Sequence, residues 1–110
     1  MPANPRPPLV HPDAGTITLV GVLHALADPT RLTIVRTLDA DPERACGTFP
    51  VTVAPSTLSH HFKVLRDAGV TSKRIEGAHH YLTLRREDLD ARFPGLLDAI
   101  LAAEPAGAAA

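Results

Sequence analysis

The segment from Pro55 to Gly69 carries the side chains of this sequence that are best suited to binding chemistry. Large apolar residues spaced four and three apart mark one face of a helix: Leu58, Phe62 and Leu65. The opposite face is short and polar: Ser56, Thr57, Ser59, His60 and Lys63. Small hydroxyl side chains let a helix backbone approach closely, and Ser, Thr, His and Lys reach base edges or phosphates. The pattern therefore predicts a helix that can enter the major groove of DNA.

The ends of this helix are marked by residues with special backbone preferences. Gly69 supplies a left-handed stop at the C-terminal end. At the other end two starts fit the sequence, with either Pro55 as the first helical residue or Ser56 as the cap. In both cases the helix N-terminus carries a partial positive charge that favours phosphate.

Two β-like stretches follow, from Val70 to Glu76 and from His79 to Leu84, joined through Gly77 and Ala78. This arrangement predicts a tight hairpin. Basic residues lie along its first strand and at its tip: Lys73, Arg74 and His79. A basic hairpin directly after a polar-faced helix is the layout of a wing beside a recognition helix.

The charged residues are distributed unevenly. The chain has 11 Lys and Arg against 12 Asp and Glu, a net charge of −1. Residues 56–86 hold six basic and two acidic side chains, a net +4, whereas residues 1–55 sum to −1 and residues 87–110 to −4. Such a basic block is the footprint expected of nucleic-acid binding. An unevenly charged, solvated surface would give the same count, so charge alone leaves both interpretations open.

The first predicted helix, from Thr16 to Ala27, is apolar on more than one side. Thr16 can cap it, and its apolar stripe is Leu19, Val22, Leu23 and Leu26. Ile17 and Val20 fall off that stripe. A helix that is apolar nearly all round must be covered on two faces. A second subunit could supply the second cover, and the alternative is complete burial within one core.

Further helices flank the binding segment. Asp28 and Pro29 form a cap and first turn, the buried stripe is Leu32, Val35 and Leu38, and Asp39–Pro42 ends this helix. Residues 43–46 are expected to form a short third helix. A last helix begins at Arg86, breaks near Phe93 and Pro94, and continues with an apolar stripe: Leu96, Leu97, Ile100 and Leu101.

Length and composition disfavour other classes of protein. The 110 residues fit one domain, predicted over residues 15–104, between flexible tails at 1–14, which is rich in proline, and 105–110. No apolar run approaches the ~18 residues of a membrane span, and the first residues have no hydrophobic signal core, which predicts a cytoplasmic protein. We find no Gly-rich phosphate loop, nucleophile elbow or triad spacing, so we do not expect an enzyme.

Three stretches resemble the ArsR/SmtB family of bacterial regulators. Residues 23–38, LHALADPTRLTIVRTL, look like the opening signature of that family. Residues 56–70, STLSHHFKVLRDAGV, look like its recognition helix, and residues 74–82, RIEGAHHYL, are similar to its wing. The order and spacing of the stretches agree with the family, and the resemblance extends over residues 16–102.

This resemblance implies a mainly α-helical winged helix-turn-helix with a small β-hairpin, forming a homodimer through its first and last helices. It implies a transcriptional regulator, by family habit a repressor, that binds a double-stranded DNA operator as a dimer, with half-sites ~34 Å apart. The residues carried over to the major groove are Ser56, Thr57, Ser59, His60 and Lys63. Those carried over to the DNA backbone or minor groove are Lys73, Arg74 and His79.

The chain departs from the family in its metal ligands. Many members use a cysteine pair before the recognition helix, where this chain has only Cys46, and one thiolate does not make a tight site for a soft metal. Others use Asp and His along the last helix, but no histidine follows His80. Adjacent histidines, as at 60–61 and 79–80, point apart. We therefore predict no metal site and no cofactor.

Several sources of a regulatory signal stay open. Cys46 could sense oxidants, and His11 or His24 could contribute to a site across a dimer. The signal could instead come from a small ligand or a regulatory protein partner. A winged-helix module that binds only proteins is the main rival function, but it would favour apolar or acidic residues on the face that here is polar and basic.

Overall fold

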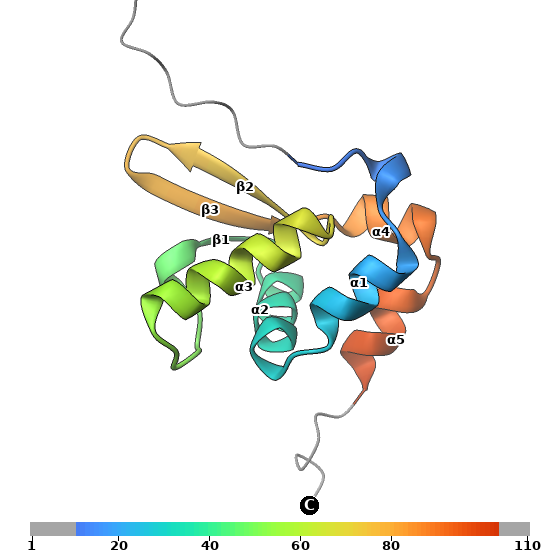
Figure 1. Ribbon diagram of the computed structural model, residues 1–110, viewed down its shortest axis with the longest axis horizontal. Coiled ribbons are helices and arrows are strands. Elements are labelled where there is room, and N and C mark those ends of the chain that lie inside the picture. The colour runs from blue at the N-terminus through green and yellow to red at the C-terminus, as the bar shows by residue number, and fades with distance from the viewer. Residues whose placement is uncertain (1–10, 104–110) are drawn as a thin grey trace, which may run out of the picture.

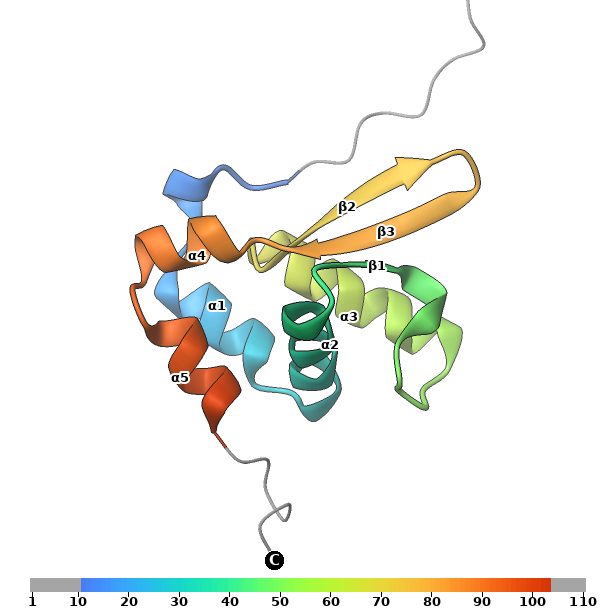
Figure 2. The same ribbon diagram turned by 180° about the vertical axis from the view of Figure 1, so that it is seen from behind.

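The computed structural model describes residues 11–103 of the chain (Figures 1 and 2). Its helices are α1 (Leu19–Leu26), α2 (Pro29–Ala40), α3 (Pro55–Asp67), α4 (Arg86–Arg92) and α5 (Leu96–Ala102). Its strands are β1 (Glu43–Ala45), β2 (Thr71–Glu76) and β3 (His79–Leu84), and short 3-10 turns cover Ala14–Thr16 and Cys46–Thr48. The predicted tails fall largely on residues 1–10 and 104–110, which lie outside the described residues.

The strands form one antiparallel sheet in the order β1-β3-β2. The predicted hairpin is present, and its turn places Gly77 at φ +60°. The short helix expected at residues 43–46 is wrong, because residues 43–45 form β1, which pairs Glu43 with Thr83 and Ala45 with Tyr81. Pairing with β3 satisfies backbone groups that a helix of one turn would leave without partners, and Gly47 lies in the 3-10 turn that follows.

The first helix begins later than the sequence suggests. The hydroxyl of Thr18 accepts from the N–H of Gly21 at 3.0 Å and caps α1, while Thr16 instead donates to the carbonyl of Asp13 at 2.7 Å. Ile17 precedes the helix and is buried in the core, so its place on a helical wheel does not apply. The predicted stripe is also divided, because Val22 and Leu26 are buried whereas Leu19 and Leu23 are exposed.

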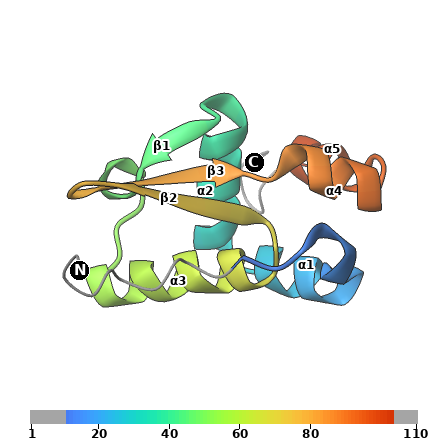
Figure 3. The same cartoon turned by 90° about the horizontal axis from the view of Figure 1, so that it is seen from above.

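Helices α2 and α3 form where the sequence predicts, but the buried residues of α2 are Ile34, Val35 and Leu38, and the predicted Leu32 is only partly buried. Asp28 caps α2 by accepting from the N–H of Arg31 at 3.0 Å, and Pro29 is the first helical residue. Figure 3 shows α3 beside the hairpin and α1 opposite α4 and α5. The core contains buried side chains from α2, α3 and the hairpin region: Ile34, Val35, Leu38, Phe62, Leu65, Val70, Leu82 and Leu84. No helix among residues 11–103 is long and apolar enough to cross a bilayer.

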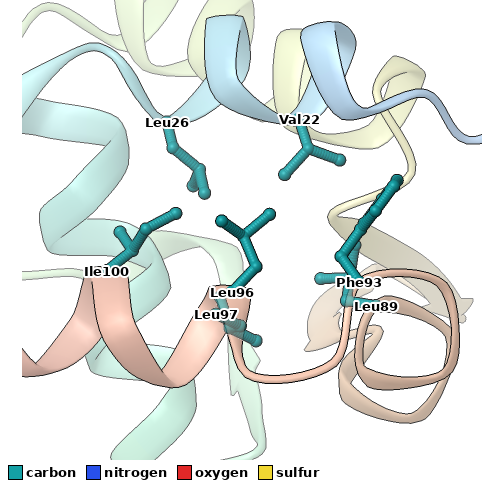
Figure 4. A pocket seen from close by; sticks show the side chains of 7 residues that line it. All are labelled: Val22, Leu26, Leu89, Phe93, Leu96, Leu97 and Ile100. Atoms are coloured by element: carbon teal, nitrogen blue, oxygen red, sulfur yellow. The ribbon is translucent and has the colours of Figure 1, made fainter.

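The last helical region is broken where the sequence predicts. Residue Phe93 follows α4, and Gly95, at φ +80°, precedes α5. Figure 4 shows Val22 and Leu26 of α1 opposite the apolar side chains of this region. The space between them is only about 10 Å³ and is lined by Val22, Leu26, Leu89, Phe93, Leu96, Leu97 and Ile100. A void of this size holds at most one water molecule, so α1, α4 and α5 pack as one apolar layer.

Candidate nucleic-acid interface

Helix α3 separates a buried apolar face from an exposed polar face. Phe62 and Leu65 are buried, and Leu58 is half-buried against the core. The structure places all of the predicted groove residues on the exposed side: Ser56, Thr57, Ser59, His60 and Lys63. The hydrophobic face therefore fixes the helix on the core, which leaves the polar face available to a partner in solution.

The structure decides between the two predicted starts of α3, Pro55 as the first helical residue and Ser56 as the cap. Pro55 is the first helical residue, and Ala54, which precedes it, makes no side-chain capping bond. The first helical backbone bond runs from the N–H of Leu58 to the carbonyl of Ala54, at 2.9 Å. Since no acidic residue lies in the first turn, this end of the helix keeps the partial positive charge that attracts anions.

Lys63 lies in the middle of the polar face and is paired within its own helix. Its Nζ lies 2.5 Å from Oδ2 of Asp67, one turn further on. The side chains of Lys63 and Asp67 are 63% and 52% exposed, and exposed pairs of this kind contribute ~1 kcal/mol or less. A phosphate could therefore replace the Asp67 carboxylate at little cost.

The three wing residues do not lie on one surface. Arg74 and His79 are exposed on the outer face of the sheet, where Arg74 contacts Glu43, Glu76 and the ring of Tyr81. Lys73 is half-buried, and alternation along a strand points it to the other face. The sequence reasoning missed the pairing of Arg74 with Glu43, because it did not predict β1. The contact of Arg74 with Glu76 could be expected from the sequence, because residues two apart on a strand point to the same face.

The basic block of residues 56–86 is divided in the fold. Arg85 lies 3.0 Å from Asp88, and Arg86 pairs with carboxylates of α2, α4 and α5: Asp39, Asp90 and Asp98. These two arginines therefore fix the helices that follow the hairpin. The basic side chains of the block that remain near the polar face of α3 and the hairpin are those of Lys63, Arg66, Lys73 and Arg74.

Comparison with known proteins agrees with this arrangement. A family described as a helix-turn-helix domain matches residues 26–74, from the end of α1 into β2. The HTH-type transcriptional regulator YceK of Bacillus subtilis (strain 168), itself uncharacterized, is 35% identical over 82 residues, which is 72% of this chain and 82% of that protein. The chain belongs to the HTH-type transcriptional regulators.

The fold of this regulator matches a solved structure. The crystal structure of an ArsR family transcriptional regulator superposes with a TM-score of 0.62 and covers 74% of this chain and 84% of its own, at 24% identity. This likeness confirms the predicted fold class, which is mainly helical with a small antiparallel sheet in a winged helix-turn-helix. The family match and the relative confirm the predicted helix-turn-helix regulator, and the likeness to the ArsR family structure, at 24% identity, is one of fold.

Arg31 connects three helices of this regulator. Arg31, in the first turn of α2, donates from Nε to the carbonyl of Ala25 at 2.6 Å. Its Nη1 lies 3.0 Å from Nδ1 of His61 on α3. Burial acts to raise the pKa of Asp28, but the hydrogen bond from the backbone N–H of Arg31 and the positive charge of Arg31 lower it overall. Arg31 thus connects the end of α1, the cap of α2 and the binding helix.

The remaining candidates for sensing occupy separate places. Cys46 is half-buried, and burial raises the pKa of its thiol against a smaller lowering effect of Lys73, which disfavours the reactive thiolate. His24 is exposed on α1. Nε2 of His11 accepts from the backbone N–H of Lys73 at 3.0 Å. Within residues 11–103, no three His, Cys, Asp or Glu side chains are grouped so that they could hold a metal ion.

Proposed function

We propose that this regulator is an ArsR-type repressor that binds its operator as a homodimer. The observation that carries the proposal is the division of α3 into a face packed on the core and an exposed face of hydroxyl, imidazole and ammonium groups. Such a helix presents donors and acceptors that fit base edges and phosphates in the major groove.

The residues divide into two roles in this proposal. Those on α3 lie in the major groove: Ser56, Thr57, Ser59, His60 and Lys63. Those on the hairpin are assigned to the DNA backbone or the minor groove: His79 and, once released from its carboxylate partners, Arg74 from the outer face, and Lys73 from the other face. Because phosphate contacts dominate such interfaces, the affinity should fall steeply as salt rises.

The outer side of α1 supports pairing of two chains. Leu19, Val20 and Leu23 fall on one side of the helix and are 45%, 76% and 43% exposed. The opposite side of α1 is already packed against α4 and α5. Burial of an exposed apolar stripe contributes a hydrophobic term of ~25 cal/mol per Å² that favours association. A dimer through α1 and α5 would cover this stripe and present two copies of α3.

The signal that releases the operator is proposed to be a partner protein or a small ligand. The support is the donor set of the chain, which has a single half-buried cysteine before α3 and no histidine after His80. Titration of the purified protein with divalent zinc, followed by calorimetry and DNA release, tests this point. Tight stoichiometric binding with loss of operator binding would exclude it.

The DNA-binding proposal is tested by fluorescence anisotropy. The labelled duplex is the region upstream of the protein's own gene, and a shuffled duplex of equal length is the comparison. Lys63→Ala should weaken binding to both duplexes and reduce the slope of log K against log salt by about 0.9, the value for one phosphate contact. Ser59→Ala should weaken binding to the gene's own duplex more than to the shuffled one.

A matched control is Arg36→Ala, which removes one positive charge from α2, where Arg36 donates to the carbonyl of Ala103 at 2.7 Å. Its affinity for both duplexes should match the wild type. Equal affinities for all variants would contradict the proposed interface. If the wild type and every variant fail to bind duplex DNA at low salt, the result would favour the rival, a winged-helix module that binds proteins.

A further inference from the structure

The outer face of the hairpin carries a compact group of charged and aromatic side chains. We define the arginine clamp as Glu43 of β1, Arg74 and Glu76 of β2, and Tyr81 of β3. Arg74 is the direct cross-strand partner of Tyr81, and Glu43 pairs with Thr83 on the far side of β3. The arginine side chain therefore lies across β3 and connects the two edge strands of the sheet.

Each nitrogen of the Arg74 guanidinium has an acceptor within this clamp. Nη2 and Nε donate to the two carboxylate oxygens of Glu43, at 2.8 and 3.3 Å, and Nη1 donates to Glu76. The guanidinium carbon lies 4.6 Å from the centre of the Tyr81 ring, in stacking range. The hydroxyl of Thr83 donates to Glu43 at 3.4 Å. Three of the five N–H donors of Arg74 are thus directed at the two carboxylates.

The charges of the clamp do not suit a surface that meets phosphate directly. Two carboxylates surround one guanidinium, so this part of the wing is net negative. The hydrogen bond from Arg74 is the main cause of the lowered pKa of Glu43, and the bonds to Glu43 and Glu76 raise the pKa of Arg74. Glu43 is therefore ionised near neutral pH, and its charge would repel a DNA backbone that approached this face.

The clamp is exposed, which makes it exchangeable. The side chains of Arg74, Glu43 and Glu76 are 48%, 44% and 69% exposed. Exposed ion pairs are weak and are screened by salt. A guanidinium forms the same paired hydrogen bonds with a phosphate as with a carboxylate. Phosphate can therefore displace Glu43, provided that the repulsion from the freed carboxylate is overcome.

We propose that Glu43 and Glu76 are positioning residues that hold Arg74 against Tyr81 and away from DNA, so that the wing binds a phosphate only by exchanging these carboxylates. The inference rests on the proposed DNA binding and adds a regulation of the same interface. The clamp lowers affinity for every duplex alike, because the contact that it withholds is to the backbone. It thereby leaves recognition to α3 and keeps the wing from holding the protein on unrelated DNA.

The test uses the full-length protein and the same two duplexes. Glu43→Gln keeps the size of the side chain but removes its charge and replaces one of its two acceptor oxygens by an NH2 donor, so it cannot accept both bonds from Arg74. We expect it to tighten binding to both duplexes about two- to five-fold, the range for one exposed ion pair. The salt slope should steepen by about 0.9, because one more phosphate is neutralised. Glu76→Gln should act in the same direction.

Two comparisons separate the clamp from a general charge effect. Asp41→Asn removes an exposed carboxylate two residues from Glu43 that pairs with Arg44 instead. We expect it to leave the salt slope unchanged. Glu43→Gln in an Arg74→Ala background should tighten binding much less than in the wild type, since no arginine remains to be released. An equal effect in both backgrounds would show simple repulsion by Glu43 and would overturn the clamp.

The outcomes also separate this inference from the proposed function. If the wild type binds duplex DNA and Glu43→Gln binds with the same affinity and salt slope, the clamp is refuted and DNA binding stands. If Glu43→Gln weakens binding, the carboxylate presents Arg74 to DNA and the inference is reversed. If neither protein binds duplex DNA at low salt, the proposed function fails and the clamp fails with it.

Discussion

Nη1 of Arg31 lies 3.0 Å from Nδ1 of His61, and this contact joins the two helices of the helix-turn-helix. A guanidinium can only donate, so Nδ1 of His61 must accept and its proton must be on the other ring nitrogen. The His61 side chain is only 12% exposed, which shields the contact from water. A residue adjacent to the polar face of α3 therefore serves to hold that helix in place.

Arg31→Ala should destabilise the fold without removing any proposed DNA contact. The variant loses the bonds to His61 and to the carbonyls of Ala25 and His24 at the end of α1. We expect a loss of about 2–3 kcal/mol in the free energy of unfolding, measured by urea titration followed by circular dichroism. Arg31→Lys keeps the charge but not the fork of donors and should recover less than half. A lysine variant as stable as the wild type would contradict this explanation.

Gly69→Ala should be more damaging than the same change at Gly77. Gly69 has φ +83°, and an added Cβ would lie 2.5 Å from Cγ1 of the buried Ile17. Left-handed strain and overlap together predict a cost of about 2–4 kcal/mol. Gly77 has φ +60° with no atom within 4 Å of the added Cβ, so only the strain, about 1–2 kcal/mol, applies there. Thermal unfolding measures both.

The overlap at Gly69 has its own control. In an Ile17→Ala background the atoms that meet the added Cβ are gone, so the cost of Gly69→Ala should fall to that of Gly77→Ala. An undiminished cost would mean that backbone strain alone explains the effect.

Stability should depend on pH through His11. Nε2 of His11 accepts from the N–H of Lys73 and so must be unprotonated. Partial burial, followed by the charges of Arg66 and Arg85, lowers the pKa of His11 below 6.5. Because the unfolded chain takes up this proton at a higher pH than the folded chain, stability falls as pH drops from 6.5 toward the lower folded pKa.

The measurement compares urea midpoints of the wild type and His11→Gln across that window. Glutamine offers an acceptor oxygen that does not titrate, so the urea midpoint of the wild type should fall relative to that of His11→Gln as pH falls. A difference between the two proteins that does not change with pH would contradict the role of His11.

Val20→Glu should shift the protein from dimer to monomer. Val20 is 76% exposed at the centre of the apolar stripe on α1, and a carboxylate there would have to be desolvated on pairing. Sedimentation velocity measures the change, and circular dichroism checks that the helices remain. Ile75→Glu, on the hairpin and 41% exposed, is the control and should leave the oligomeric state unaltered. A monomeric wild type would remove the basis of this prediction.

Local sequence patterns were sufficient to predict the central elements of the fold. The spacing of Leu58, Phe62 and Leu65, with Gly69 as a stop, located α3 and the exposure of its polar face. The paired β-rich stretches around Gly77 located the hairpin. These features depend on residues close together in the chain, where periodicity and turn chemistry act directly.

Elements that depend on distant contacts could not be predicted in this way. Strand β1 exists because each of its residues pairs with a residue of β3 that lies 36 or more positions further on, and its own three residues carry no strand pattern. The burial of Ile17 depends on its contact with Gly69. The clamp around Arg74 depends on β1, so it was invisible for the same reason. Charge counting likewise could not separate Arg85 and Arg86, which bind helices, from the basic residues near α3.

Both ends of α1 are attached to α3. At its start, Ile17 lies on Gly69, directly after α3, and at its end the Ala25 carbonyl is joined through Arg31 to His61. The two helices are therefore connected at both ends of α1, and pairing of two chains through α1 would set the angle and separation of both recognition helices. Substitutions at Leu19, Val20 or Leu23 that preserve pairing would consequently alter the preferred distance between operator halves while leaving the bases read within each half the same.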